Sequence, residues 1–266
     1  MYRSGLLGAP WPLVPIALAL FATSSAAADS EGGRVTFSTG LDFSRGDYGQ
    51  EEKTDIWYLP LTLAYERGPW IAKVTVPLIQ IEGPGDVVGG TEGSVVIGGG
   101  AGERSRERGL GDIVTSLSYV IYVPDSIWPL VELTGKVKFG TADEEDGLGT
   151  GENDYTAQLD LAKTIGRVTP FVTVGHRWIG EPSGVELDNV LFASAGLGLR
   201  LTRRLSVGAI YDFKEAASDA SEDSRELVPY LSLRLSEHMK VGTYTVIGLS
   251  DSSPDLGLGF NVGYSW

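Results

Sequence analysis

The hydrophobic positions of this chain alternate with polar or small positions over segments of about ten residues. The pattern is clearest in DLGLGFNVGYSW, where every second residue from Leu256 to Trp266 is apolar and the residues between them are glycine, asparagine or serine. Successive side chains of a strand point to opposite faces. The segment therefore predicts a strand with one apolar face and one face of small and polar residues.

The same period of two recurs along the chain between polar, turn-rich stretches. No helical periodicity stands out after residue 28. With the terminal segment, the pattern predicts about twelve strands, an even number as in bacterial single-chain barrels. The other segments are VTFSTGLDF, WYLPLTLAY, WIAKVTVPL, DIVTSLSYVIY, LVELTGKVKF, YTAQLDLAKT, PFVTVGHRW, VLFASAGLGLRL, LSVGAIYDFK, ELVPYLSLRL and KVGTYTVIG, of which the last is ambiguous in phase.

The connections between these segments alternate between short and long. The short ones centre on residues 67–69, 124–126, 166–167, 203–204 and 237–238. The long ones include residues 82–108 and the acidic stretch TADEEDGLGTGEN. One rim of short turns and one rim of long loops is typical of outer-membrane barrels. Because the predicted strand number is even, we expect the N- and C-termini at the short-turn rim, on the periplasmic side.

Tryptophan gives an independent indication of a membrane-spanning barrel. Trp57, Trp70, Trp128, Trp178 and Trp266 each fall at or beside the end of a predicted strand. Amphipathic aromatic rings form girdles at the two membrane interfaces, whereas the core of a soluble sandwich has aromatics at mid-strand. The pattern places Trp57 and Trp178 at the outer rim and the other three at the inner rim. A soluble secreted sandwich is the alternative fold.

The N-terminal residues predict a secretory signal peptide. Arg3 precedes the apolar run PLVPIALALF, and SSAAADS then offers a small-residue cleavage site after Ala28. A signal anchor or a buried helix is the alternative, but the run is short for a membrane span and contains Pro12 and Pro15. We therefore expect a signal peptide over residues 1–28 and an outer-membrane β-barrel over residues 29–266.

Composition excludes several classes of site. The 266 residues include no cysteine, which excludes disulfides and thiolate metal sites. The formal net charge of −14 argues against nucleic acid as a partner, because phosphate binding needs a broad basic surface. The expected partners are instead outer-membrane lipids, small-molecule solutes and the barrel assembly machinery, which would recognise the strand that ends in the aromatic Trp266.

The strand face opposite the apolar face turns charged residues toward the barrel interior. Besides Asp42, Lys214 and Glu226, this face carries the candidate solute-contacting residues, which are the basic Lys73, Lys136, Lys138, Arg177, Arg200 and Arg234 and the acidic Asp112, Glu132, Asp160 and Asp212. They either form a polar conduit, in which the basic residues attract a carboxylate, or pair across a narrow barrel and fill it. About twelve strands lie between plugged small barrels and open porins, so both interpretations stay open.

The long connections do not match known ligand-binding loops. Residues 82–108 are glycine-rich but lack the lysine of a phosphate-binding loop and a following helix, so we expect a surface loop, one that could fold into the pore. The acidic TADEEDGLGTGEND does not have the spacing of an EF-hand calcium loop, so it is expected to be a solvated loop. No metal site and no cofactor are predicted.

Histidine chemistry is the remaining catalytic candidate. Some outer-membrane barrels are lipid or peptide hydrolases that need a histidine base near a nucleophile or an acid. His176 is the better placed of the two histidines, near the outer rim beside Trp178, whereas His238 lies in a short turn. No serine–histidine spacing stands out, so we expect that the protein is not an enzyme.

The chain resembles a family of Gram-negative proteins named for the MetA pathway of phenol degradation. The resemblance rests on GLGDIVTSLSYVIY, LTGKVKFGTADEEDGLGTGENDYTAQLDLAKTIG and SDSSPDLGLGFNVGY, and it covers most of the chain after residue 28. It implies an outer-membrane barrel with a porin-like uptake role, near genes for the breakdown of aromatic compounds. It carries over no binding residues.

Together these features predict an outer-membrane transporter or channel for passive uptake of small solutes, aromatic or hydrophobic compounds among them. One alternative is a closed structural or adhesive barrel that displays acidic extracellular loops. The other is a barrel hydrolase that uses His176.

Overall fold

A computed structural model describes residues 33–84, 87–88, 95–96, 104–122, 127–182, 184, 186–219 and 221–266. The predicted signal peptide lies outside the described residues. The strands are β1 (Arg34–Gly46), β2 (Thr54–Arg67), β3 (Trp70–Gly83), β4 (Val87–Val88), β5 (Val95–Val96), β6 (Ser105–Leu110), β7 (Ile113–Ile121), β8 (Leu130–Phe139), β9 (Asp154–Ala162), β10 (Val168–Trp178), β11 (Val190–Arg200), β12 (Leu205–Lys214), β13 (Ser224–Arg234), β14 (Met239–Gly248) and β15 (Leu256–Ser265).

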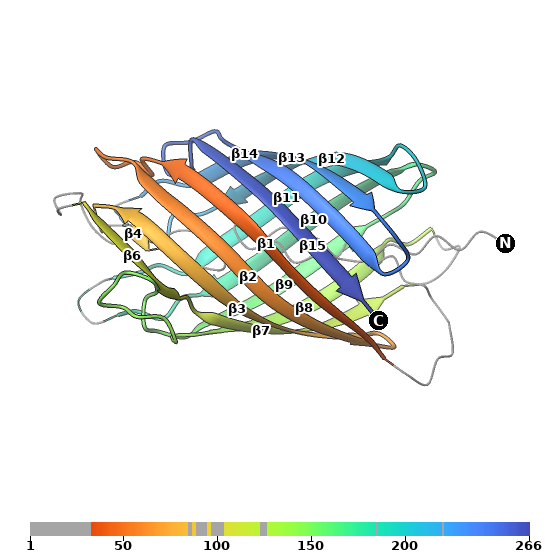
Figure 1. Cartoon of the computed structure of the whole chain (residues 1–266), viewed down its shortest axis with the longest axis horizontal. Coiled ribbons are helices and arrows are strands. Elements are labelled where there is room, and N and C mark those ends of the chain that lie inside the picture. Colours follow the sequence, from red (N-terminus) through yellow and green to blue (C-terminus); the bar gives the residue numbers. More distant parts are fainter. Residues whose placement is uncertain are drawn as a thin grey trace.

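The strands form a closed antiparallel barrel with oblique strands (Figure 1). Neighbours in sequence are neighbours in the wall, and β1 pairs with β15 from Thr36–Ser265 to Arg45–Leu256 to close it. Strands β6 and β7 both pair with β3 and make one wall strand that is interrupted at Gly111 and Asp112. The barrel therefore has twelve wall strands, which confirms the predicted all-β fold. No helix that could cross a membrane occurs among the described residues.

The long connection after β3 is shorter than its sequence suggested. Residues 82–108 were expected to form one loop, but Glu82 belongs to β3 and residues 105–110 form β6, while β4 and β5 pair within the connection. Strand β6, SRERGL, lacks the apolar alternation that marks a membrane-facing strand. It is held instead by backbone pairing with β3 and by the ion pair between Arg106 and Glu82, a form of stabilisation that hydrophobic periodicity does not detect.

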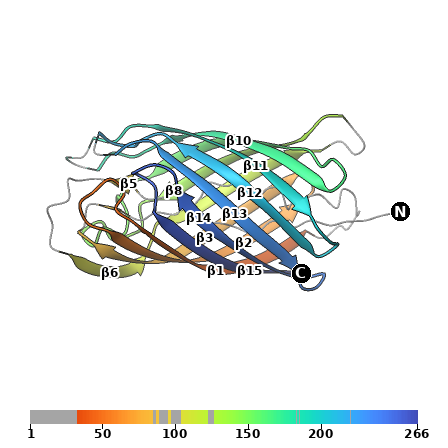
Figure 2. The ribbon, with the colours of Figure 1, turned by 90° about the horizontal axis from the view of Figure 1, so that it is seen from above.

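The two rims differ as the loop lengths predicted. The short turns and the C-terminal end of the chain lie together at one end of the barrel, and the long connections lie at the other (Figures 1 and 2). The ends of the barrel sequence are joined there by backbone hydrogen bonds between Val35 and Trp266. At the long-loop rim, Lys53 donates to Asp255 at 2.6 Å and ties two connections together. That hydrogen bond and the carboxylate charge raise the pKa of Lys53.

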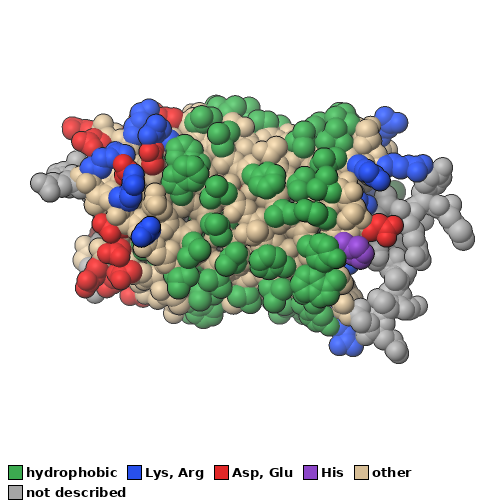
Figure 3. Space-filling model, viewed as in Figure 1, with side chains coloured by type: hydrophobic (Ala, Val, Ile, Leu, Met, Phe, Trp, Pro, Cys, Tyr) green, Lys and Arg blue, Asp and Glu red, His purple; other side chains and the backbone are tan. Residues whose placement is uncertain are grey.

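The outside of the barrel carries an apolar band between two charged rims (Figure 3). In β15, Leu256, Leu258, Phe260 and Tyr264 are about half exposed on this surface, whereas the residues between them are buried toward the interior or half-buried. Trp57 and Trp178 lie toward the long-loop rim, and the other described tryptophans lie at the short-turn rim. The phase of β14, which the sequence left ambiguous, is set by Tyr244 and Val246, which are buried inside.

Several inward glycines leave room for an aromatic ring of a neighbouring strand. A Cβ at Gly175 would meet the ring of Phe192 at 2.1 Å, and one at Gly259 would meet the ring of Tyr244 at 2.0 Å. The ring of Tyr244 crosses above β15 and its hydroxyl donates to Asp42 on β1 at 2.6 Å. Gly259 therefore has a packing role, because the absence of a side chain there lets the ring of Tyr244 cross β15 and reach β1.

We expect Gly259→Ala to lower the free energy of unfolding of the barrel by about 1–3 kcal/mol, the usual cost of overpacking. The new methyl group would displace Tyr244 and disturb its bond to Asp42. Gly263→Ala is the matched control on the same strand and face, because its Cβ would lie 3.7 Å from the nearest atom, in ordinary contact. Urea unfolding in lipid vesicles measures both. Equal stability of the two variants would contradict the packing role.

Candidate functional site

The lumen contains the charged residues that strand phase assigned to it. Asp42, Glu132, Lys138, Asp160, Arg177 and Asp212 are buried inside the barrel, and Lys73, Lys136, Arg200, Lys214, Glu226 and Arg234 share the inward phase and are half-buried. Asp112 is buried at the interruption between β6 and β7. Contact of these residues with a solute remains a prediction, but the structure separates them into groups with different surroundings.

Two of the predicted basic residues belong to a buried ion network near the long-loop rim. The Lys138 ammonium lies 3.0 Å from an Asp112 carboxylate oxygen and 3.1 Å from one of Asp154, and the Arg177 guanidinium pairs with the same Asp154 oxygen. All four side chains are almost fully buried. The sequence left open whether the lumen charges form a polar conduit or pair with one another. Lys138 and Arg177 are paired.

Asp154 was not among the predicted residues. It begins β9 and has the inward phase of Thr156 and Asp160. Extending the predicted strand by one residue toward its N-terminus would have identified it. The predicted segment began at Tyr155, because the residues before it resemble a loop.

The ion network fixes the connection between β8 and β9. One oxygen of Asp112 accepts hydrogen bonds from the backbone N–H groups of Thr141 and Ala142, both at 3.0 Å. Lys138 donates to the Thr150 hydroxyl at 3.0 Å near the other end of the connection. Buried charges need such paired and hydrogen-bonded surroundings. The network therefore holds both ends of this connection against the barrel.

The middle of the same connection enters the lumen. Leu148 is 1% exposed and belongs to an outer apolar cluster. The other buried members are Tyr48, Ile56, Tyr58, Ile79, Ile81 and Val87. Tyr48 comes from the β1–β2 connection and has a φ of 53°, a left-handed conformation that is costly for a tyrosine and turns its ring inward. Segments of three long connections thus cover the β2–β3 side of the outer lumen.

A second apolar cluster, the inner apolar cluster, lines the opposite side of the lumen. Its buried members come from β10, β12, β13 and β14 and are Phe171, Ile210, Val228, Tyr230, Tyr244 and Val246. The sequence predicted a polar lumen and did not identify either cluster. For the outer apolar cluster the signal was present in the inward phase of Ile56, Tyr58 and Ile79, but large apolar residues on both faces of a strand are also typical of a soluble core.

The acidic residues of the lumen differ in their hydrogen-bond partners. Asp160 accepts hydrogen bonds from Thr173 at 2.7 Å and from the Gln158 amide. Asp212 lies opposite Glu226 in the pairing of β12 with β13, and its carboxylate is buried beside Ser194 of β11. Burial thus places Asp212 among the side chains that fill the lumen.

The basic residues that remain lie mainly at the short-turn end. Lys73 is near the start of β3, and Arg200 and Arg234 end β11 and β13. Arg234 pairs in register with Lys240 of β14. The inward side chains at this mouth thus include four basic residues from four strands, together with Glu66 of β2.

Neither histidine lies in the lumen. His176 is on the outside of β10, and its ring packs edge-on against Trp178 with centroids 4.7 Å apart. His238 has its Nδ1 2.8 Å from the Ser265 carbonyl oxygen and stacks on Tyr264. Both positions are those of girdle or rim residues. Within the described ranges, no group of three or more histidine, aspartate or glutamate residues could hold a metal ion.

Solved structures with the same fold are outer-membrane barrels. The COG4313 outer membrane channel from Pseudomonas putida F1 superposes with a TM-score of 0.68 over 91% of this chain and 100% of that chain, at 12% identity. The likeness shows the fold. The transport unit of the autotransporter AIDA-I from Escherichia coli gives 0.53 over 93% and 94% at 9% identity, and the translocator domain of NalP from Neisseria meningitidis gives 0.52 over 89% of both chains at 12%. No family model and no curated protein sequence matches the chain.

Proposed function

We propose that this protein is an outer-membrane channel or transporter for passive uptake of small apolar solutes, aromatic compounds among them. The observation that carries the proposal is the lumen lining, in which two apolar clusters stand beside a buried ion network and hydrogen-bonded acidic residues. A ligand site of this composition binds the body of an apolar solute and orients it through few polar contacts. In this proposal the long loops are extracellular and both ends of the chain are periplasmic.

The apolar clusters supply a favourable path for an aromatic ring. Tyr58, Ile79, Phe171 and Tyr230 are buried in this structure, so a solute reaches them only when the side chains and connections that cover them move aside. A ring that takes their place would bury apolar surface, which contributes about 25 cal/mol per Å². Passive passage requires such sites to be weak and several, so that the solute leaves as readily as it binds.

Conductance and uptake of the refolded chain from residue 29 test the proposal together. We expect channels in a planar bilayer, and faster entry of a small aromatic compound into vesicles that contain the barrel than into vesicles without it. A folded barrel with neither activity would overturn the proposal and favour the structural or adhesive alternative. Uptake without conductance would indicate that the solute passes through the barrel wall and not along the lumen. The candidate place in the wall is the pairing of β2 with β3, where Pro60 faces Pro77.

The basic side chains at the short-turn end of the lumen predict that the channel has an ion selectivity. We expect the triple variant Lys73→Gln, Arg200→Gln and Arg234→Gln to shift the reversal potential in a salt gradient toward cation preference, because it removes three positive charges from one mouth. Arg203→Gln, an exposed residue in the adjacent β11–β12 turn, is the control. Unchanged selectivity in a conducting triple variant would show that these side chains do not face the path of the ions.

A further inference from the structure

The outer surface of β2, β3 and β6 carries rows of different chemistry at the long-loop rim. Strand register places Leu59, Leu78 and Leu110 in an apolar row. The next row toward the rim contains Trp57, Gln80 and Arg108, and the row after it contains Asp55, Glu82 and Arg106. Arg108 is thus an exposed cation in the row between the outward leucines and the charged rim.

Arg108 differs from its neighbours in having no carboxylate. Arg45 on β1 pairs with Asp55 at 2.6 Å, and Arg106 pairs with Glu82. Arg104 lies 3.5 Å from Glu82 and 4.0 Å from Asp55. Arg108 forms no ion pair with the described residues. These four arginines face two carboxylates, which leaves a local surplus of positive charge on a chain whose net charge is −14.

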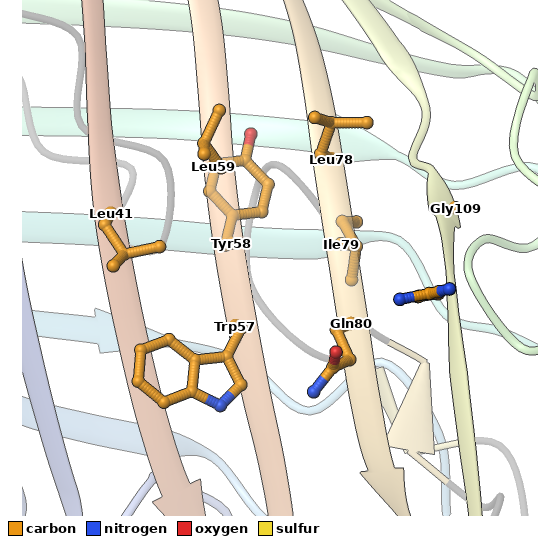
Figure 4. A pocket seen from close by; sticks show the side chains of 9 residues that line it. Leu41, Trp57, Tyr58, Leu59, Leu78, Ile79, Gln80 and Gly109 are labelled. Carbon is orange, nitrogen blue, oxygen red and sulfur yellow. The ribbon is translucent and has the colours of Figure 1, made fainter.

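An apolar groove lies directly beside Arg108. It encloses about 420 Å³, within the range of ligand sites, and its lining includes Leu41, Trp57, Leu59 and Leu78 with Gln80 and Arg108 at its edge. In Figure 4 the ring of Trp57 extends from β2 toward β1, where Leu41 lies, and Leu78 and Gln80 lie on the neighbouring strand β3. Leu41, Trp57 and Leu78 are each more than 40% exposed, so the groove opens to the outside of the barrel.

From this juxtaposition we propose that the groove and Arg108 form a binding site for lipopolysaccharide, the phosphorylated glycolipid of the outer leaflet. An acyl chain occupies the groove, and the guanidinium binds a phosphate. Arginine binds phosphate through two parallel hydrogen bonds, and Arg108 is exposed with no carboxylate partner among the described residues. A neutral apolar solute would leave Arg108 unpaired, and a free phosphate would leave the groove empty. The groove opens to the outside of the barrel, and Tyr58 and Ile79 of the wall complete its lining. The inference rests on the orientation in the proposed function, with the long-loop rim at the outer leaflet, and not on what passes through the lumen.

The test measures lipid binding by the refolded barrel in detergent. Native mass spectrometry with titrated lipopolysaccharide should show one tightly bound molecule per barrel, and Arg108→Gln should weaken its binding at least tenfold. Arg225→Gln is the matched control, an exposed arginine on β13 that lies outside the groove. Channel activity of Arg108→Gln should equal that of the unchanged chain, which separates this proposal from the proposed function.

Competing lipids identify the occupant. Phosphatidylglycerol at equal concentration should not displace lipopolysaccharide, and inorganic phosphate should compete only at much higher concentration. Equal affinity of Arg108→Gln and Arg225→Gln would overturn the site, as would displacement by phosphatidylglycerol. A Trp57→Ala variant checks the acyl part, because it opens the groove without changing charge, and unchanged affinity there would also contradict the proposal.

Discussion

Replacing Lys138 by methionine is expected to lower the free energy of unfolding of the barrel by about 3–5 kcal/mol, the cost of breaking a buried ion pair. The substitution takes the ammonium away from Asp112 and Asp154, whose carboxylates stay buried. Methionine has a similar length and leaves no large cavity, so the loss reports the missing charge. Urea unfolding in vesicles, followed by tryptophan fluorescence, gives the value.

Two further variants separate charge from packing. Lys136→Met changes a half-buried lysine on the same face of β8 and should cost much less. Adding Asp112→Asn to Lys138→Met should recover part of the lost stability, because it removes one of the two carboxylates that the lysine neutralised. Equal losses for Lys136→Met and Lys138→Met would show that the network does not stabilise the fold.

Replacing Leu148 by asparagine is expected to increase single-channel conductance several-fold. A buried leucine contributes about 2–5 kcal/mol to its cluster, and a buried amide without partners adds a further cost. The connection would therefore leave the outer apolar cluster and uncover the β2–β3 side of the lumen. Planar-bilayer recordings at fixed salt measure the change.

Leu187→Asn is the control for this loop prediction. Leu187 is also a buried leucine of a long connection, but it packs with Ile179, Val190 and Ala217 instead of the outer apolar cluster. Its substitution should leave conductance near that of the unchanged chain. Conductance that is unchanged in Leu148→Asn, with the barrel folded, would show that the β8–β9 connection does not limit the pathway.

The barrel could be predicted from sequence because its signals are local. A membrane-facing strand needs an apolar side chain at every second position, and this requirement is visible in each segment without knowledge of its neighbours. The alternation of short and long connections then predicted one rim of short turns and one rim of long loops, as the structure has them. Strand β6 escaped prediction because Arg106 and Arg108 face the outside beyond the apolar band, where lipid imposes no such pattern.

The site was less predictable because its contacts join distant segments. Phase placed Lys138 and Asp112 on the inside, but only the fold shows that both converge with Asp154 and bind the ends of one loop. Likewise, Leu148 lies in an acidic, glycine-rich stretch and has no periodic context. Its burial depends on β2 and β3, which lie about 70–90 residues away in sequence.

The small inward residues of β15 also affect how the barrel closes. The seam between β1 and β15 joins the two ends of the sequence, so it carries the largest loop-closure entropy of any pairing in the wall. Glycine at positions 257, 259 and 263 means that few bulky side chains must find their rotamers as the two edges meet. The Tyr244–Asp42 hydrogen bond spans that seam and can form only after the edges have joined. This hydrogen bond would therefore form late in assembly, and its presence distinguishes the closed barrel from an open sheet.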